Sequence, residues 1–191
     1  MGTLQVGGTT LATKNSSTGK VDLHDTNIHF PAGAVIKKTY YSIGRGTMAS
    51  DSFPNDDTVP QRDEGAEIFS QAYTPSTTSC TILITTYVRL GESSNVNAGM
   101  QLGLFMKDLG DASLHMDALI VGENLNNAST NPNGGNITLM CSITSWSGAR
   151  TLSLRSSGGN TFNYATEDTA FASQKFGSAF TSAFIVEEIA T

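Results

Sequence analysis

The chain has 191 residues, a length that suits one domain with a full hydrophobic core and an additional arm. Charged residues make up 15% of the sequence, below the roughly 25% usual for soluble domains. The net charge is −6, and the 11 Lys and Arg residues are scattered. This argues against a nucleic-acid partner, because phosphate binding requires clustered cations. No apolar run approaches the ~18 residues that span a bilayer, so no membrane insertion is expected.

The first 33 residues differ from the rest, because short apolar pairs alternate with polar turns. The apolar positions are Leu4, Val6, Leu11, Val21, Leu23, Ile28 and Phe30. Each piece is too short to form a stable sheet alone. The arm could pack on its own domain, or identical arms of neighbouring chains could pair, which we favour because short strands with polar turns suit an intertwined stem. A disordered arm is the third alternative, and seven apolar residues at this spacing count against it. We expect residues 1–33 to be an arm for anchoring or trimer pairing, with no secretory signal.

Residues 34–191 alternate apolar and polar side chains with the period of β-strands. The strongest patterns lie in residues 81–90 and 100–107, and the polar connector between them predicts an antiparallel hairpin. Residues 137–144 and 149–155, joined by a Ser-Trp-Ser-Gly turn, predict a second hairpin. Further strands are expected at 34–43, 68–74, 114–120, 162–165 and 180–190.

The segment 114–120 also fits a helical stripe, so its assignment as a strand is the weakest. The last segment, 180–190, is apolar on both faces and is expected to be buried on both. With about eight antiparallel strands and no convincing helix, residues 34–191 are predicted to form an all-β, antiparallel jelly-roll β-sandwich, preceded by the extended N-terminal arm.

The polar segment 44–65 is a long loop rich in carboxylates. Its acidic residues are Asp51, Asp56, Asp57, Asp63 and Glu64. A loop of this length in a compact domain is usually functional or flexible. Carboxylate oxygens are calcium ligands, but the spacing of a known calcium loop is absent, so a solvated loop is the favoured interpretation. No metal or cofactor is expected.

Few residues suggest catalysis. His24 and His29 have opposite parity in an extended arm, so one chain does not aim both at one ion, although a trimer could gather three copies of one histidine. His115 has no context of a general base, and no nucleophile motif occurs, so we expect no enzymatic activity. Cys80 and Cys141 lie in strand-like runs and are expected to be free, structural thiols.

Trp146 is the one candidate contact residue. It lies in the Ser-Trp-Ser-Gly turn, where an exposed indole can stack on a sugar ring. The alternative, which we favour, is that it caps the core or enters a subunit interface.

Three runs, Phe30–Lys37, Tyr73–Ile84 and Ala183–Thr191, together resemble virion proteins of marine tailed phages, of the tail-fibre type. The resemblance covers roughly residues 30–191 and implies a trimeric jelly-roll domain without a catalytic signature. The short arm and the long 44–65 loop depart from the family pattern. A short arm leaves room for a short fibre, a head fibre or a capsid decoration protein.

These observations predict a non-enzymatic structural protein on the virion surface, assembled in the host cytoplasm. The first hypothesis is a homotrimeric short tail fibre or receptor-binding protein, whose arm contacts other virion proteins and whose sandwich meets the host surface, including its glycans. The second is a capsid decoration protein that stabilises the head. The third, from another class, is a carbohydrate-binding or carbohydrate-active domain.

Overall fold

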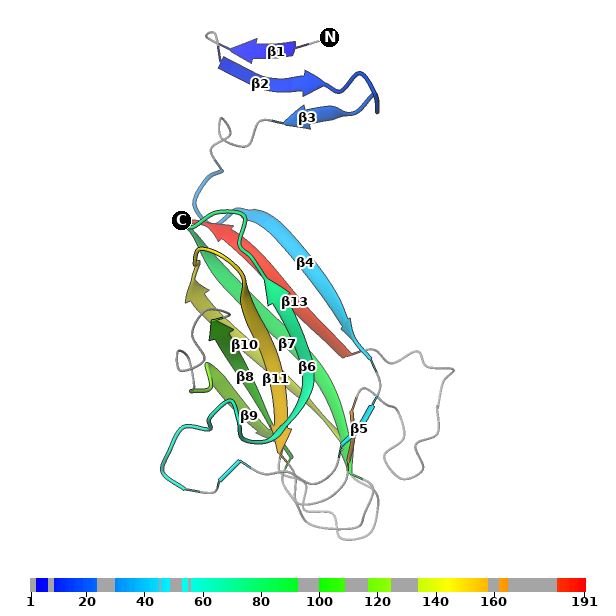
Figure 1. Cartoon of the computed structure of the whole chain (residues 1–191), viewed down its shortest axis with the longest axis vertical. Coiled ribbons are helices and arrows are strands. Elements are labelled where there is room, and N and C mark those ends of the chain that lie inside the picture. Colours follow the sequence, from blue (N-terminus) through cyan, green and yellow to red (C-terminus); the bar gives the residue numbers. More distant parts are fainter. Residues whose placement is uncertain are drawn as a thin grey trace.

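The computed structural model describes residues 3–6, 9–23, 30–44, 46–48, 53–54, 56–92, 100–108, 117–124, 134–157, 162–164 and 182–191. These residues form strands and turns, and none of them forms a helix. The described part of the chain therefore contains no helix that could cross a membrane. Two packed sheets make a sandwich, and a small three-stranded sheet stands beyond the end at which the C-terminus lies (Figure 1).

Eight strands build the sandwich. They are β4 (Val35–Ile43), β6 (Ala66–Tyr73), β7 (Cys80–Glu92), β8 (Met100–Asp108), β9 (Ile120–Asn124), β10 (Gly134–Thr144), β11 (Arg150–Ser157) and β13 (Ser182–Ala190). One sheet has the order β4-β13-β7-β10, and the other has the order β6-β11-β8-β9. Two short strands, β5 (Gly46–Met48) and β12 (Phe162–Tyr164), extend the first sheet beside the end of β7.

The strand pairing defines a jelly roll. The first strand pairs with the last, β4 with β13, and the next pairs are β6 with β11, β7 with β10 and β8 with β9. All these pairs are antiparallel, so the chain is a doubled ribbon wrapped into two sheets. Within the first sheet β13 also pairs with β7, and within the second sheet β11 also pairs with β8. These contacts join successive strand pairs of the ribbon into continuous sheets. The predicted all-β jelly-roll sandwich is therefore confirmed.

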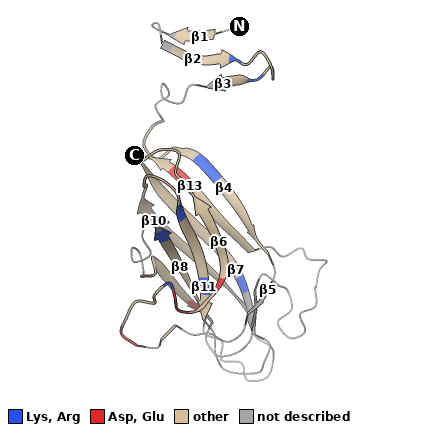
Figure 2. Cartoon of the chain, in the orientation of Figure 1, with Lys and Arg blue, Asp and Glu red and all other residues tan. Residues whose placement is uncertain are grey.

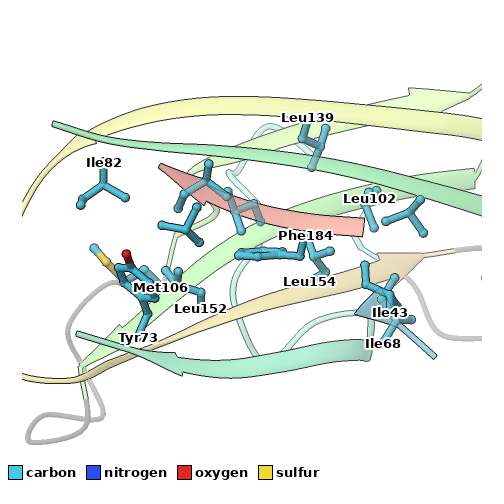
Figure 3. Packing of buried hydrophobic residues seen from close by; sticks show 14 of the residues in the cluster. Ile43, Ile68, Tyr73, Ile82, Leu102, Met106, Leu139, Leu152, Leu154 and Phe184 are labelled. Atoms are coloured by element: carbon cyan, nitrogen blue, oxygen red, sulfur yellow. The ribbon is translucent and has the colours of Figure 1, made fainter. Parts of the chain in front are cut away.

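The core lies between the two sheets and is built by the predicted alternation. Its fully buried side chains include Ile82, Ile84, Val88, Leu102, Leu104, Leu152, Leu154, Phe184 and Val186. Figure 3 labels Ile82, Leu102, Leu152, Leu154 and Phe184 among them. Residues two apart on a strand face the same side, so each strand contributes one apolar row. Burial of a core of this size accounts for a stable fold without disulfides.

Both predicted hairpins are wrong. The strand β7 pairs with β10, β12 and β13, whereas β8 pairs with β9 and β11, so the two strands lie in opposite sheets. The same holds for β10 and β11, because β11 pairs with β6 and β8. Apolar alternation identifies the face that enters the core but not the hydrogen-bonded neighbour. In a jelly roll, these connections cross from one sheet to the other.

Three further boundaries differ from prediction. Of the strand expected at 114–120, residues 114–116 lie outside the described part, and Asp117 forms only an isolated bridge to Gln61; β9 begins at Ile120 and runs to Asn124. The strand β10 begins at Gly134, three residues before the strand expected at 137–144, and β5 lies within the predicted 44–65 loop.

The last strand, β13, was expected to be buried on both faces, and this holds for one face only. Phe184 and Val186 are fully buried, whereas Ala183, Ile185 and Ile189 on the other face are half-buried. The outer face of its sheet has no covering layer among the described residues.

The opposite sheet is covered on its outer face by part of the acidic loop. The Phe53 ring packs 6.1 Å from the Phe105 ring on β8, and the Phe53 amide donates a 2.8 Å hydrogen bond to Ser157 Oγ. A Cβ at Gly103 would come 2.7 Å from the Phe105 ring, so glycine makes room for this ring. Phe105 is buried although it lies on the outer face of its strand.

The arm strands pair with one another within one chain, which neither expected arrangement included. The strands β1 (Thr3–Val6), β2 (Thr9–Lys14) and β3 (Val21–Leu23) form an antiparallel sheet in that order. Ala12 is buried, but Leu4 and Val21 stay exposed. The division at residue 33 and the pairing of arms between copies remain predictions.

Candidate functional site

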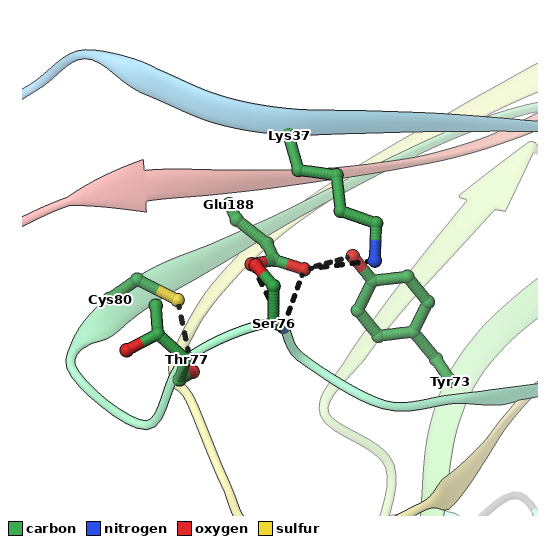
Figure 4. A network of polar contacts seen from close by, with 6 residues as sticks. All are labelled: Lys37, Tyr73, Ser76, Thr77, Cys80 and Glu188. Atoms are coloured by element: carbon green, nitrogen blue, oxygen red, sulfur yellow. Dashed lines mark hydrogen bonds and ion pairs between the residues drawn. The ribbon is translucent and has the colours of Figure 1, made fainter. Parts of the chain in front are cut away.

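Three segments of the chain, residues 30–37, 73–84 and 183–191, meet at one end of the sandwich. Lys37 comes from the first segment on β4, Tyr73 and Ser76 come from the second at the end of β6 and after it, and Glu188 comes from the third on β13. Their side chains converge on the Glu188 carboxylate (Figure 4). We call these four residues the junction cluster, because the arm joins the sandwich at the same end (Figure 1).

Glu188 is fully buried, yet donors surround its carboxylate. Tyr73 Oη donates to Oε1 at 2.7 Å, and the Ser76 amide donates to both oxygens at 3.1 Å. Ser76 Oγ donates to Oε2 in a short hydrogen bond, and Lys37 Nζ lies 3.4 Å from Oε1. A buried carboxylate persists only when such partners replace its water.

These contacts determine the protonation state of the cluster. Burial by itself raises the pKa of Glu188, but the hydrogen bonds from Ser76 and Tyr73, with the Lys37 charge, hold that pKa below its usual value. Burial and the hydrogen bond to Glu188 raise the pKa of Tyr73 well above that of a free phenol. At neutral pH the cluster therefore holds one carboxylate, one ammonium and a neutral phenol.

Aromatic contacts extend the cluster toward Trp146. The Lys37 ammonium lies 5.1 Å from the centroid of the Tyr73 ring, and Trp146 meets that ring edge-on at 6.3 Å. The Arg150 guanidinium lies 5.5 Å from the Trp146 ring. Only 5% of Trp146 is exposed, and its Nε1 has no hydrogen-bond partner among the described residues. A ligand or interface contact at Trp146 stays a prediction.

The chemistry of the cluster favours a structural lock over a catalytic centre. The Ser76 hydroxyl donates its hydrogen bond to a carboxylate that three other groups also hold in place, the Tyr73 hydroxyl, the Ser76 amide and the Lys37 ammonium. Nucleophilic catalysis requires a base that can accept and release the proton of the hydroxyl. The described contacts of Ser76 include no histidine or lysine in that role.

The cluster lies beside the point at which the arm enters the sandwich. The Gly33 amide donates to the Ala190 carbonyl at 2.8 Å, and the Ala190 amide donates to the Ala34 carbonyl at 2.8 Å. Gly33 has φ +87°, a conformation that favours glycine. Glu188 thus fixes the last residues of β13, and Ala190 in this part of the strand forms the hydrogen bonds with Gly33 and Ala34.

Sequence reasoning missed Glu188. The available signal was its parity, because Glu188 continues the apolar row of Phe184 and Val186 on β13. A charged residue on a core-facing row requires buried partners. The partners Tyr73 and Ser76 lie more than a hundred residues away, so no local pattern identifies them.

The other candidates do not gather into a site. His24, His29 and His115 lie outside the described residues. Among the described residues, no three His, Cys, Asp or Glu side chains lie close enough to hold a metal ion. The described end of the acidic loop packs on the sandwich, where Arg155 donates to the carbonyls of Glu64 and Gly65 at 2.6–3.1 Å.

Both thiols are free, as predicted. Cys80 is buried and Cys141 is half-buried. Burial raises the pKa of each thiol, which keeps both in the unreactive protonated form.

No family model matches the chain, and no curated protein matches it. Solved structures give weak likenesses. The Eiger TNF of S. frugiperda has TM-score 0.48 at 11% identity, covering 81% of this chain and 93% of that one. The CBM22-1 xylan-binding domain of Paenibacillus barcinonensis Xyn10C has TM-score 0.32 at 11% identity, covering 85% and 99%.

A third likeness is to a protein of the T13 IBDV viral particle, with TM-score 0.35 at 12% identity. It covers 93% of this chain and 39% of the viral chain. These similarities are too low to carry an argument about function. The class of the protein, a jelly-roll β-sandwich, rests on the strand pairing itself, and the relation to phage virion proteins stays a prediction.

Proposed function

We propose that this chain is a non-enzymatic structural protein on the surface of a virion, a short tail fibre or receptor-binding protein. One observation carries the proposal: a small arm sheet, separate from the sandwich, leads into an end that the junction cluster locks (Figure 1). In this proposal the arm is held by the particle and the sandwich faces outward. Jelly rolls recur in viral capsid and lectin domains, although a fold alone does not define a function.

The arm is the part that contacts other virion proteins. Leu4 and Val21 are exposed on its sheet, so their apolar surfaces are available to a partner. We further propose that the chain acts in the particle as a homotrimer. The sandwich then faces outward, where it meets host-surface glycans.

A second candidate is a capsid decoration protein. Only residues 24–34 separate β3 from β4, so the sandwich stays near whatever surface holds the arm. A short link suits a protein that lies on the head and stabilises neighbouring capsid subunits. A carbohydrate-active enzyme is the least supported alternative, because the buried Glu188 carboxylate is committed to structural contacts.

Imaging of intact virions tests this proposal. An antibody raised against the folded sandwich is bound to purified particles, which are viewed by electron microscopy. Label at the tail supports the fibre, and label spread over the head supports the decoration protein. Particles that lack the chain would contradict both.

An arm variant sharpens the experiment. Replacing Leu4 and Val21 together by Asp should abolish incorporation into particles while leaving the melting temperature of the sandwich unchanged. Thr3→Asp is the matched control, because Thr3 is exposed on the same strand as Leu4. Normal incorporation of the double variant would show that the arm is not the anchor.

A further inference from the structure

One outer face of the sandwich carries large exposed apolar side chains. On the β4-β13-β7-β10 sheet, Met140 is 64% exposed, Tyr40 is 55% exposed and Tyr87 is 38% exposed. These residues alternate along their strands with core residues such as Leu139, so they point outward. We call this surface the outer face of the first sheet.

Strand register joins these side chains into one surface. Tyr40 lies opposite Ile185, Ile185 lies opposite Thr85, and Thr85 lies opposite Met140. This row crosses all four strands of the sheet. Tyr87 lies in a parallel row opposite Ala183. Facing side chains on adjacent strands lie about 5 Å apart, so the exposed groups form a continuous patch.

The two outer faces of the sandwich are treated differently. The opposite sheet is capped by Phe53, whose ring covers Phe105 so completely that Phe105 is fully buried. The first sheet has no such cap among the described residues, and Ile185 on its central strand is half-buried. The outer row of β13 is therefore apolar, and no cap like Phe53 covers it among the described residues of its own chain.

The composition of the patch is that of a protein interface. Tyr, Met and Arg are enriched in interface cores relative to other surfaces. Here two tyrosines, Met140 and Arg89 share one face. The described charged residues of the face are Lys38, Glu187 and Arg89.

The charge of the face indicates which class of partner can bind it. Lys38 Nζ lies 3.0 Å from Glu187 Oε1, and Arg89 Nη1 donates to Asn136 Oδ1 at 3.4 Å. One anion and two cations leave the face slightly positive, whereas the whole chain has a charge of −6. Figure 2 colours the described Lys and Arg residues blue and the described Asp and Glu residues red. A second copy of this acidic chain complements the face. Two cations are too few for a nucleic acid.

We propose that the outer face of the first sheet is the surface through which copies of this chain associate. The inference rests on the proposed function and names the contact that holds its trimer. In a cyclic trimer the contact is heterologous, so the face of one copy packs against a different surface of the next. The edge strand β4 and the outer row of β13 are then buried in the assembly.

Oxidation of Met140 reports on this contact in the unmodified full-length chain. Hydrogen peroxide converts an exposed methionine to its sulfoxide. At micromolar concentration, Met140 should oxidise several-fold more slowly in the assembled protein than in the urea-unfolded chain. Peptide mass spectrometry measures both rates. Equal rates would show an open face and overturn the inference.

Light scattering of two full-length variants gives the second readout. Met140→Glu places a charge at an exposed position, so the sandwich should still fold. The molecular mass measured by light scattering should fall below that of the parent assembly. Ser70→Glu is the control, on an exposed outer position of β6 in the opposite sheet, and should keep the parent mass. Near-ultraviolet circular dichroism verifies folding of both. A monomeric parent, or a Met140→Glu variant with the parent mass, would overturn the inference.

The two proposals fail separately. A chain that associates through this face but is absent from virions contradicts the proposed function and leaves the contact intact. A chain present on virions with Met140 open to peroxide contradicts the contact and leaves the proposed function intact.

Discussion

Lys37 and Glu188 lie opposite each other on the first and last strands of the sandwich, with Nζ 3.4 Å from Oε1. The pair thus ties together the two ends of a chain segment of about 150 residues. Tyr73, at the end of β6 in the second sheet, and Ser76, in the connector after β6, also bind the Glu188 carboxylate. Because the arm enters beside this pair, the stability of the cluster and the attachment of the arm should depend on the same contacts.

The first prediction concerns the buried carboxylate. Glu188→Gln keeps the shape but leaves donors from Tyr73 and Ser76 competing for one oxygen, so it should lower the free energy of unfolding by about 1–3 kcal/mol. Urea denaturation measures the change. Glu187→Gln is the matched control at the neighbouring residue, where the partner Lys38 is exposed, and should cost at most about 1 kcal/mol. Equal costs for the two variants would contradict the structural role of Glu188.

The second prediction concerns pH. Folding lowers the pKa of Glu188 below its usual value of 4.5, so the unfolded chain binds more protons in acid. The stabilisation by Glu188 is therefore complete above about pH 4.5 and is lost as pH falls through the lower folded-state pKa. The pKa of Tyr73 is raised by burial and by Glu188, so its phenol stays neutral in this range. Unfolding free energies measured from pH 6 downward should fall less steeply for Glu188→Gln than for the parent.

The third prediction concerns the two central strands. Ile84 on β7 and Leu104 on β8 are fully buried on the inner faces of opposite sheets. Replacing either by Ala should cost on the order of 2–5 kcal/mol, the range for removing a buried Ile or Leu side chain. The exposed Ser70 provides a control, since Ser70→Ala should change stability by less than about 0.5 kcal/mol. If Leu104→Ala lowered the free energy of unfolding by no more than Ser70→Ala does, Leu104 would not belong to the core.

The fourth prediction concerns Trp146. Because its ring is buried against Tyr73 and Arg150, Trp146→Ala should cost about 3–5 kcal/mol, as for other buried aromatic residues. Trp146→Phe should cost less, since it keeps a ring and removes an Nε1 that has no described partner. Thermal unfolding ranks the variants. If Trp146→Ala left the melting temperature unchanged but weakened attachment to host cells, the indole would be a ligand contact.

The fifth prediction concerns the thiols. In denaturant without reductant, a thiol reagent should titrate two groups per chain, because Cys80 and Cys141 are unpaired. In the native protein both should react slowly, since burial raises the pKa of each and withholds the thiolate. A titration of zero groups in denaturant would indicate a bridge and contradict the structure.

The sequence by itself determined the fold class, most strand positions and the core. Alternation in segments such as 81–90 and 100–107 depends only on neighbours along the chain, and it identified Ile84 and Leu104 as inward-facing. A side-chain period of two is a local property of an extended backbone. For the same reason, the apolar outer row of β13 was visible in the sequence before any surface could be assigned to it.

Only the tertiary structure decided which strands pair and which polar groups meet. Hydrogen-bonded neighbours in a jelly roll are distant in sequence, so β7 lies beside β13 and β10 rather than beside β8. Glu188 finds Tyr73 and Ser76 in the same way, across more than a hundred residues. These contacts depend on the wrapping of the doubled ribbon, which is a property of the whole chain and leaves no local pattern.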